Sequence, residues 1–263
     1  MSKPRNYQTE ALIIRKTKLG EADRILSLYT PRLGKIQAVA KGVRRPRSKM
    51  SGHLELLTHS LISLARGRNI DTVTNTRTVT AFLPLKSDLW RGAGALYTAE
   101  LVDKFTADHI ENQPLFELVR NTWHRLAETD DLETTLRSFE LHLLKEVGYR
   151  PELGHCVACK AAPGPAGNWF GPMAGGVLCP GCGPKHSLKY PISSQALSAL
   201  QSLQKDQPIM NPPPGTNPAL ARELTALMGH YLEYLLEREI KSARWLGNLR
   251  LELAMTTTTQ PGG

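Results

Sequence analysis

The sequence predicts an α+β protein of several domains. It consists of a small N-terminal β-barrel of the oligonucleotide-binding (OB) type, then an all-α domain with an inserted four-cysteine zinc module. Three observations predict this fold class: short β-prone runs fill the first 80 residues, helical periodicity begins near Ser87, and all four cysteines lie between Cys156 and Cys182. The predicted parts are the barrel (1–82), the first helical part (83–150), the zinc module (151–190), the second helical part (191–255) and a disordered tail (256–263).

Five runs near the N-terminus have the composition of short strands. They lie at residues 11–17, 24–30, 35–40, 58–65 and 71–80, with turns between them. Short strands at this spacing are typical of a small barrel or sandwich. An OB barrel is the most economical choice, although an SH3-like barrel would give nearly the same pattern.

Apolar residues recur at helical spacing in the rest of the chain. Helices are predicted to begin near Ser87 or Asp88, at Pro114, at Asp130, at Ser193 and at Asn217, with the last one running to about Lys241. Asp, Ser and Asn are favoured caps, and Pro suits the first turn of a helix. Residues 206–216 are rich in proline and predict a stiff linker, and residues 256–263 are of low complexity.

The positive charge of the chain is concentrated at one end. The net charge is +9, but residues 1–80 hold 16 Lys and Arg against 5 Asp and Glu, whereas the remaining residues hold 17 against 19. A basic segment on a near-neutral body indicates a binding face. The first residues lack the apolar core of a secretory signal, and no run approaches the roughly 20 apolar residues of a membrane span, so we expect a cytoplasmic protein without a membrane partner.

The stretch at residues 35–50 is the most basic part of this segment. Its β-prone beginning leads into a loop that carries Lys41, Arg44, Arg45, Arg47 and Lys49, and none of its residues is acidic. Cations packed this closely repel one another unless a polyanion neutralises them, and nucleic-acid phosphate is the commonest such partner. The alternative is a solvated loop that binds nothing, and the uneven charge of the chain favours binding.

The four cysteines form two C-x-x-C pairs. Cys156 and Cys159 are followed 19 residues later by Cys179 and Cys182, which is the paired-knuckle pattern of one structural Zn²⁺ held by four thiolates. Between Pro163 and Pro184, 12 of 22 residues are Gly or Pro, so we expect the metal rather than a core to stabilise the segment. A redox C-x-x-C or two disulfides are the alternatives, and His155 and His186 are reserve ligands.

Patterns of common catalytic sites are missing. There is no P-loop, no H-E-x-x-H and no G-x-S-x-G, and the basic segment has no convergent group of carboxylates, so we expect a protein that is not an enzyme. His142 is expected to be a packed, hydrogen-bonded residue. Residues 1–80 contain only Tyr7 and Tyr29 as aromatics, and Tyr29 could stack one base or lie in the core. Binding is therefore expected to be mainly electrostatic and insensitive to sequence.

Several segments resemble the RecO family of bacterial DNA repair and recombination mediators. They are GEADRI (20–25), YTPRLGK (29–35), AKGVRR (40–45), RSFEL with LL (137–144), GYRP (148–151), Cys156 with Cys159, and IKS (240–242). They follow the order of the family along the whole chain. In many relatives a glycine follows the second cysteine, where this chain has Lys160.

The resemblance implies an OB barrel, a helical body and a zinc-binding module. It also implies binding of single- and double-stranded DNA, annealing of complementary strands, and loading of RecA together with RecR onto DNA coated by single-strand-binding protein, in the cytoplasm at the nucleoid. Carried over by position, the DNA-contact candidates are Arg15, Lys16, Lys18, Arg24, Lys35, Lys41, Arg44, Arg45, Arg47 and Lys49. The alternatives are a zinc protein that binds structured RNA, a metal-dependent nuclease, and a scaffold whose basic loop meets an acidic protein.

Overall fold

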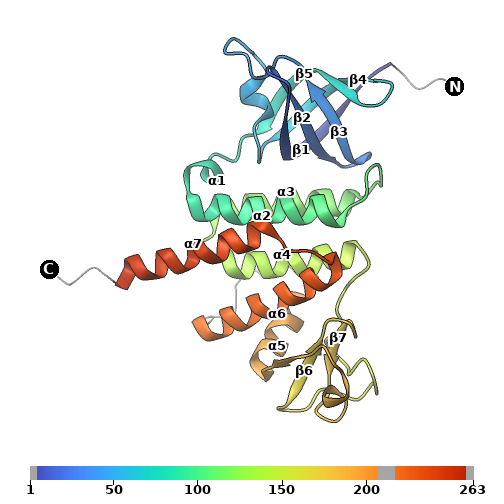
Figure 1. Cartoon of the computed structure of the whole chain (residues 1–263), viewed down its shortest axis with the longest axis vertical. Coiled ribbons are helices and arrows are strands. Elements are labelled where there is room, and N and C mark those ends of the chain that lie inside the picture. The colour runs from blue at the N-terminus through green and yellow to red at the C-terminus, as the bar shows by residue number, and fades with distance from the viewer. Residues whose placement is uncertain (1–4, 206–216, 259–263) are drawn as a thin grey trace. The chain divides into compact units, whose positions relative to one another are not determined.

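The computed structural model describes residues 5–205 and 217–258, which form two compact units (Figure 1). Unit 1 comprises the described residues up to 130 and from 241 onward, and unit 2 comprises the described residues between 131 and 240. Unit 1 includes helices as well as the barrel because the helices at residues 89–105 and 113–128 contact the barrel; the predicted domain boundaries stay a prediction. Among the helices of the described ranges, none combines the length and the apolar character that a membrane span requires.

Unit 1 begins with a closed five-stranded barrel. Its strands are β1 (Asn6–Leu19), β2 (Asp23–Thr30), β3 (Gly34–Ala40), β4 (His59–Ala65) and β5 (Asp71–Thr80). The order around the barrel is β1-β2-β3-β5-β4, and only β3 and β5 pair in parallel. This OB-like barrel, followed by helices, confirms the predicted fold class.

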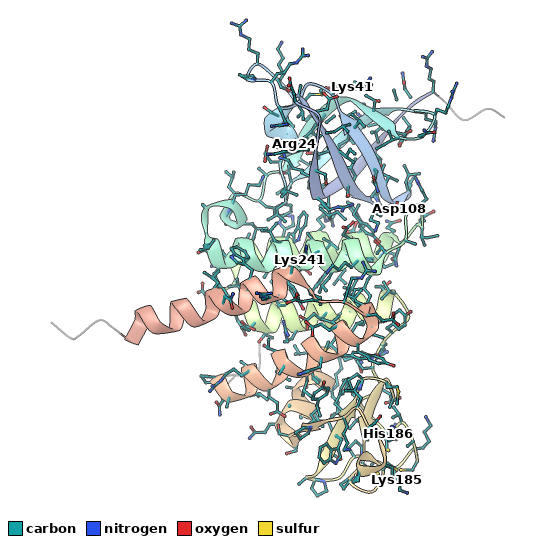
Figure 2. The ribbon with its side chains drawn as sticks, viewed as in Figure 1. Arg24, Lys41, Asp108, Lys185, His186 and Lys241 are labelled. Atoms are coloured by element: carbon teal, nitrogen blue, oxygen red, sulfur yellow. The ribbon has the colours of Figure 1, made fainter. Side chains whose placement is uncertain are left out.

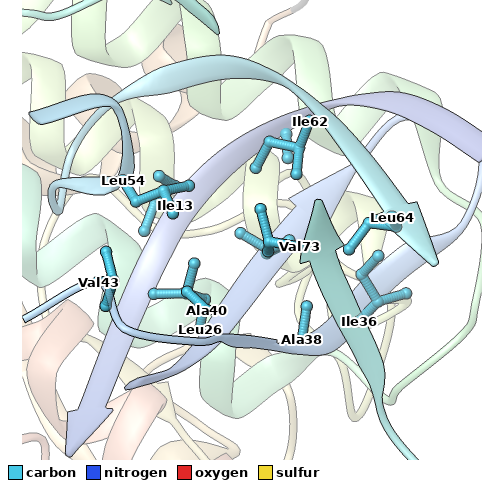
Figure 3. Close-up of a cluster of buried hydrophobic side chains, with 12 residues drawn as sticks. Ile13, Leu26, Ile36, Ala38, Ala40, Val43, Leu54, Ile62, Leu64 and Val73 are labelled. Atoms are coloured by element: carbon cyan, nitrogen blue, oxygen red, sulfur yellow. The ribbon is translucent and has the colours of Figure 1, made fainter. Parts of the chain in front are cut away.

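Strand β1 begins at Asn6, five residues before the predicted start at residue 11. The prediction missed residues 6–10 because they are mostly polar. Residues 6–10 pair with β4, whereas the next four residues, Ala11 to Ile14, are all buried. The alternation is weak there because both faces are covered: Ala11 and Ile13 point into the barrel, and the outer face of β1 contacts helix α2 (Leu89–Phe105). The side chains that fill the barrel come from all five strands and from the loop after β3 (Figure 3).

Four α-helices complete the part of unit 1 that the structure describes. They are α1 (Pro84–Ser87), α2, α3 (Gln113–Glu128) and α7 (Lys241–Thr258). Asp88 caps α2 by accepting a hydrogen bond from the Arg91 backbone N–H at 2.8 Å, as the sequence predicted. Trp123 of α3 is fully buried and donates to the Thr98 hydroxyl of α2 at 2.9 Å, which fixes the two helices side by side.

Helix α7 is an element that the sequence did not predict. The expected helix to about Lys241 ends earlier, at Leu236, and α7 then extends to Thr258, so residues 256–258 are helical rather than part of a disordered tail. Its first turn is capped from α2, because the Glu100 carboxylate accepts hydrogen bonds from the backbone N–H groups of Lys241 (3.3 Å) and Ser242 (2.7 Å). The predicted linker (206–216) and residues 259–263 lie outside the described residues.

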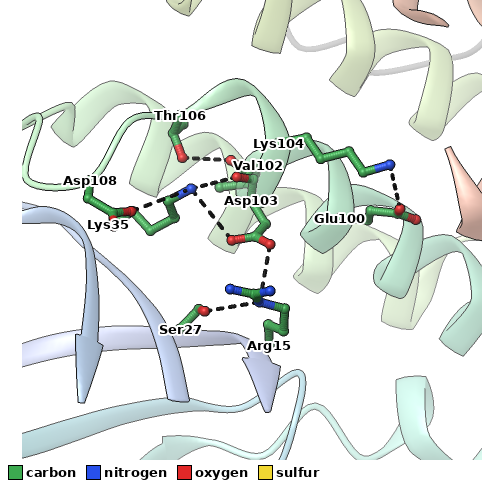
Figure 4. A network of polar contacts seen from close by, with 9 residues as sticks. All are labelled: Arg15, Ser27, Lys35, Glu100, Val102, Asp103, Lys104, Thr106 and Asp108. Atoms are coloured by element: carbon green, nitrogen blue, oxygen red, sulfur yellow. Dashed lines mark hydrogen bonds and ion pairs between the residues drawn. The ribbon is translucent and has the colours of Figure 1, made fainter. Parts of the chain in front are cut away.

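An ionic network joins the barrel to α2 and to the loop that follows it (Figure 4). Lys35 donates to the backbone oxygen of Asp103 at 2.5 Å, and its Nζ lies 3.5 Å and 3.6 Å from the carboxylates of Asp103 and Asp108. Arg15 pairs with the same Asp103 at 3.2 Å. Gly34 allows the loop after α2 to approach the start of β3 closely, because a Cβ at Gly34 would lie 1.9 Å from the Ile110 backbone oxygen.

Unit 2 combines three helices with a small sheet. Its elements are α4 (Leu132–Glu146), β6 (Asn168–Gly171), β7 (Gly176–Leu178), β8 (Tyr190–Ile192), α5 (Ser194–Leu203) and α6 (Pro218–Leu236). The sheet order is β7-β6-β8, with antiparallel pairs. The caps of α4 and α5 are Asp131 and Ser193, within a residue of the predicted starts. His142 of α4 makes a hydrogen bond with the Ser138 oxygen at 2.8 Å, as expected for a packed histidine.

Candidate nucleic-acid interface and metal centre

One end of the barrel gathers most of the predicted contact residues. Lys18 near the end of β1 is paired in register with Arg24 near the start of β2, and Arg24 is paired with Ala40 at the end of β3. The loop of residues 41–50, which we call the basic loop, begins directly after Ala40. Figure 2 shows Lys41 at the end of the barrel away from Asp108, which belongs to the loop after α2 and pairs with Lys35. The sheet register therefore brings three separate segments to one charged end.

The basic loop is docked on the turn between β1 and β2. Gly42 donates its backbone N–H to the Asp23 carboxylate at 2.7 Å. Arg44 donates its backbone N–H to the Ala22 oxygen at 2.9 Å and its guanidinium to the Gly20 oxygen at 3.1 Å. These bonds hold the loop in one conformation, so its cations are presented by a folded surface rather than by a mobile chain.

Two residues of the loop explain why it adopts this path. Gly42 has a φ of +63°, a region that glycine enters without a steric penalty. Val43, which is only 5 % exposed, turns back into the barrel core and packs with Leu54. The chain is thus anchored inside by Val43 while Lys41 and Arg44 are exposed.

The cations of this end are available to an external anion. Within the described ranges, none of seven predicted contacts pairs with a carboxylate: Lys18, Arg24, Lys41, Arg44, Arg45, Arg47 and Lys49. All except Arg24, which is half-buried, are exposed. A surface of this kind is suited to the phosphates of a nucleic acid, whose binding releases counterions.

Three other predicted contacts are engaged inside the protein. Lys35 lies in the network described above with its side chain only 12 % exposed, and Lys16 pairs with Glu55 at 2.6 Å with its side chain 6 % exposed. Arg15 is half-exposed but is held between Asp103 and the Ser27 hydroxyl. We therefore propose a contact set without these three, because phosphate would have to displace their own carboxylates.

Tyr29, one of the two aromatic residues among residues 1–80, is not available to stack a base. Tyr29 is 1 % exposed, so it belongs to the core and cannot stack a base. Sequence reasoning missed the residues that shape the basic loop, notably Asp23 and Val43. The available signal was the Lys41-Gly42 turn, because a glycine at a strand end indicates a positive φ.

The four cysteines converge in unit 2, where they could bind one metal ion. The Sγ atoms of Cys156, Cys159, Cys179 and Cys182 all lie within 4.8 Å of one another. The Cys159 and Cys179 sulfurs are 3.7 Å apart, far beyond the roughly 2.05 Å of a disulfide. Tetrahedral Zn²⁺ with bonds of about 2.3 Å would place its sulfurs about 3.8 Å apart, so the spacing fits one such ion.

The two knuckles have matching backbone geometry. Lys160 donates its backbone N–H to the Cys156 oxygen at 2.9 Å, and Gly183 donates to the Cys179 oxygen at 2.9 Å. Burial raises the pKa of Cys156, but backbone N–H groups of Cys179, Cys159 and Ala158 outweigh it and lower that pKa to about 6. These donors favour the thiolate form, which is the form that binds a metal.

The cysteine segment contributes to a core, contrary to the expectation from its Gly and Pro content. Phe170 and Val177 of the small sheet are buried, and the Phe170 ring meets Tyr231 of α6 edge-on at 5.3 Å. Lys160 has a φ of +64° at the place where a glycine would be unstrained. The segment is therefore stabilised by packing as well as by the metal ion that the four thiolates could bind.

Comparison with known proteins gives a consistent result along the chain. A family model described as "Recombination protein O N terminal" matches residues 1–82, and one described as "Recombination protein O C terminal" matches residues 86–244. The chain is 41 % identical over 249 residues to the DNA repair protein RecO of Dehalococcoides mccartyi, covering 95 % of this chain and 98 % of that protein. It is 39 % identical over 258 residues to the DNA repair protein RecO of Roseiflexus sp., covering 98 % and 91 %.

Proposed function

The chain belongs to the RecO family, and we propose that it is a DNA-binding recombination mediator in DNA repair. The observation that carries this proposal is the end of the barrel where seven cations are free of internal carboxylates in the described structure. The family membership supports DNA as the polyanion.

The proposed mechanism requires no bond to be made or broken. The basic loop neutralises backbone phosphates of both single- and double-stranded DNA, and its surface offers no aromatic groups that would read bases. Neutralisation lowers the repulsion between two complementary strands, so the protein promotes their annealing. With RecR it assists the loading of RecA onto DNA coated by single-strand-binding protein, in the cytoplasm at the nucleoid.

Charge reversal in the basic loop tests the proposal. The variant Arg44→Glu, Arg45→Glu, Arg47→Glu should lose DNA binding and annealing, because each substitution replaces a phosphate contact by a repulsive charge. The melting temperature should change little, since all three side chains are exposed and the variant loses only one side-chain hydrogen bond, from Arg44 to the Gly20 oxygen, while the backbone bonds of the loop remain. Affinity and annealing are measured by fluorescence anisotropy and strand pairing at several salt concentrations, with RNA as competitor.

The matched control carries the same change of net charge elsewhere. Arg150, Lys205 and Arg238 are exposed residues of unit 2, and their reversal to Glu should leave DNA binding nearly unchanged. Wild-type affinity in the basic-loop variant, or an affinity that does not depend on salt, would place the contact elsewhere and refute the mechanism.

We further propose that the metal is a single structural Zn²⁺. Four thiolates close the coordination sphere, which leaves no position for a catalytic water. Mass spectrometry of the native protein should show one bound zinc per chain. A mass equal to that of the metal-free chain, or one reduced by the four hydrogen atoms lost when two disulfides form, would exclude this assignment.

A further inference from the structure

The basic loop carries a hydroxyl group that the proposed DNA binding does not use. Ser48 lies between Arg47 and Lys49 and is partly exposed. Its hydroxyl has no hydrogen-bond partner among the described residues, whereas the hydroxyl of Ser51, the next serine along the chain, donates to the Ser48 backbone oxygen at 3.0 Å. Of these two serines, Ser48 is therefore the one whose hydroxyl is unengaged.

The sequence before Ser48 has the charge pattern of a substrate for an arginine-directed protein kinase. Arg44, Arg45 and Arg47 precede Ser48 by four, three and one residues. Kinases select substrates partly by such patterns, because acidic groups beside their active sites pair with arginines that precede the reacting hydroxyl. No other serine or threonine of the chain follows three arginines within four residues. The pattern therefore singles out Ser48.

The segment around Ser48 is held at its two ends rather than along its length. Val43 before it and Met50 after it pack on the core of the barrel. The residues at 44–49 between these anchors are exposed, apart from the partly exposed Ser48. A segment with so few buried contacts opens locally at small cost, so it can enter the active site of a modifying enzyme while both anchors stay in place.

A phosphoryl group on Ser48 would lie among the cations of the loop. The Ser48 backbone N–H donates to the Arg45 oxygen at 3.0 Å, and the first and fourth residues of such a turn have Cα atoms less than about 7 Å apart. Arg47 and Lys49 are its neighbours in the chain. Phosphoserine carries a charge of about −1.5 to −2 near pH 7 and accepts charge-assisted hydrogen bonds from such cations. It would therefore neutralise about two of the cations that we assign to DNA.

We propose that Ser48 is a phosphorylation site that weakens DNA binding by the basic loop. A serine/threonine kinase transfers the γ-phosphoryl group of ATP: the bond from Ser48 Oγ to phosphorus forms, the bond from phosphorus to the leaving ADP breaks, and the hydroxyl proton passes to the catalytic base of the kinase. Hydrolysis by a phosphatase restores the hydroxyl and releases inorganic phosphate. The effect on binding rests on the proposed DNA-binding function, whereas the modification itself does not.

The size of the effect follows from counterion release. Losing about two phosphate contacts on a single strand reduces the slope of log K against log[salt] by about 1.4. Because this electrostatic contribution vanishes near about 1 M salt, the affinity at about 0.15 M should fall by about tenfold. Ser48→Asp adds one charge and should reduce the slope by about 0.7 and the affinity by about fourfold. Ser48→Asn has nearly the same shape without the charge, so this matched control should bind like wild type.

Phosphopeptide mapping of the full-length protein tests the modification. Protein isolated from its own cells, before and after DNA damage, should contain a peptide phosphorylated on Ser48. The purified chain incubated with an arginine-directed kinase and Mg-ATP should take up one phosphoryl group, Ser51→Ala should be modified like wild type, and Ser48→Ala should not be modified. Absence of phosphate from Ser48 in both samples from cells, or modification of Ser48→Ala at the wild-type rate, overturns the proposal.

Fluorescence anisotropy tests the effect on binding. The probe is an oligothymidylate of about 20 nucleotides, which is longer than a barrel of this type holds. The phosphorylated chain should bind it about tenfold more weakly than the unmodified chain at about 0.15 M salt, and phosphatase treatment should restore the affinity. Equal affinity of the two forms would overturn the effect on binding while the basic loop remains the contact. If the unmodified chain binds no DNA, the proposed function fails instead, whether or not Ser48 carries phosphate.

Discussion

Replacing Lys35 with Met separates a structural cation from a binding one. The Lys35 ammonium would be lost from a site where its side chain is 12 % exposed and where it donates to the Asp103 oxygen at 2.5 Å. A hydrogen bond of this kind contributes about 1 kcal/mol, and removing one partner of a fully buried ion pair costs about 3–5 kcal/mol. Here Asp103 is 18 % exposed and keeps Arg15 at 3.2 Å, so we expect a loss of about 2 kcal/mol.

The expected readout is thermal unfolding combined with DNA binding. For a folded body of this size about 1 kcal/mol corresponds to about 2–4 °C, so the melting temperature should fall by about 4–8 °C. Below that temperature Lys35→Met should bind DNA with an unchanged salt slope. Lys41→Met, at the first position after β3, removes an exposed cation and should show the reverse: unchanged melting and weaker DNA binding. If Lys35→Met melted like wild type and bound DNA with a smaller slope, Lys35 would be a phosphate contact and our assignment of the network would be wrong.

Two further predictions concern pH and the metal knuckle. Burial lowers the pKa of His59 below its ordinary value, despite the Glu10 carboxylate 3.0 Å away, so below about pH 6.5 the unfolded chain binds a proton that the folded barrel does not. Stability of unit 1 should therefore fall as the pH drops from about 7 to 5, and His59→Gln should flatten this fall in thermal scans; an equal fall in the variant would contradict the assignment. Lys160→Gly should relieve up to about 1 kcal/mol of strain at its left-handed φ and tighten zinc binding by up to about fivefold in a chelator competition. Lys160→Ala, which removes the same side chain but keeps the strain, is the control, and equal tightening in both would point to charge instead.

The sequence predicted elements whose signals are local. The strand at residues 24–30 is a short apolar, β-prone run that ends at a turn, and the cysteine spacing alone indicated a closed site. Helix α7 was missed because its N-terminal cap, Glu100, is supplied by a helix more than 130 residues earlier in the chain. The polar start of β1 was missed because its pairing with β4 comes from backbone hydrogen bonds, which no side-chain pattern reveals.

The candidate contact set shows the same division. Lys41 and Arg44 could be identified from the run of cations itself, because their environment is solvent. Lys16 and Lys35 could not be assigned, since their partners Glu55 and Asp103 become neighbours only when the barrel closes and docks on α2. Sequence position carries the charge of a residue but not the carboxylate that neutralises it.

Strand β3 keeps two groups of cations apart: those that pair with carboxylates of the helical part of unit 1, and those of the basic loop that stay available to a ligand. Lys35 and Lys41 stand at opposite ends of β3, six residues apart and therefore separated by about 20 Å along an extended strand. This exceeds the Debye length of about 8–10 Å at physiological salt, so Asp103 and Asp108 would compete little with DNA at the basic loop, the contact that we propose. Salt should accordingly weaken the exposed DNA contact far more than the half-buried Lys35 network, because a buried pair is screened much less than a solvent-exposed one. A short strand thus separates the charge that holds the barrel on its helices from the charge that is left for a ligand.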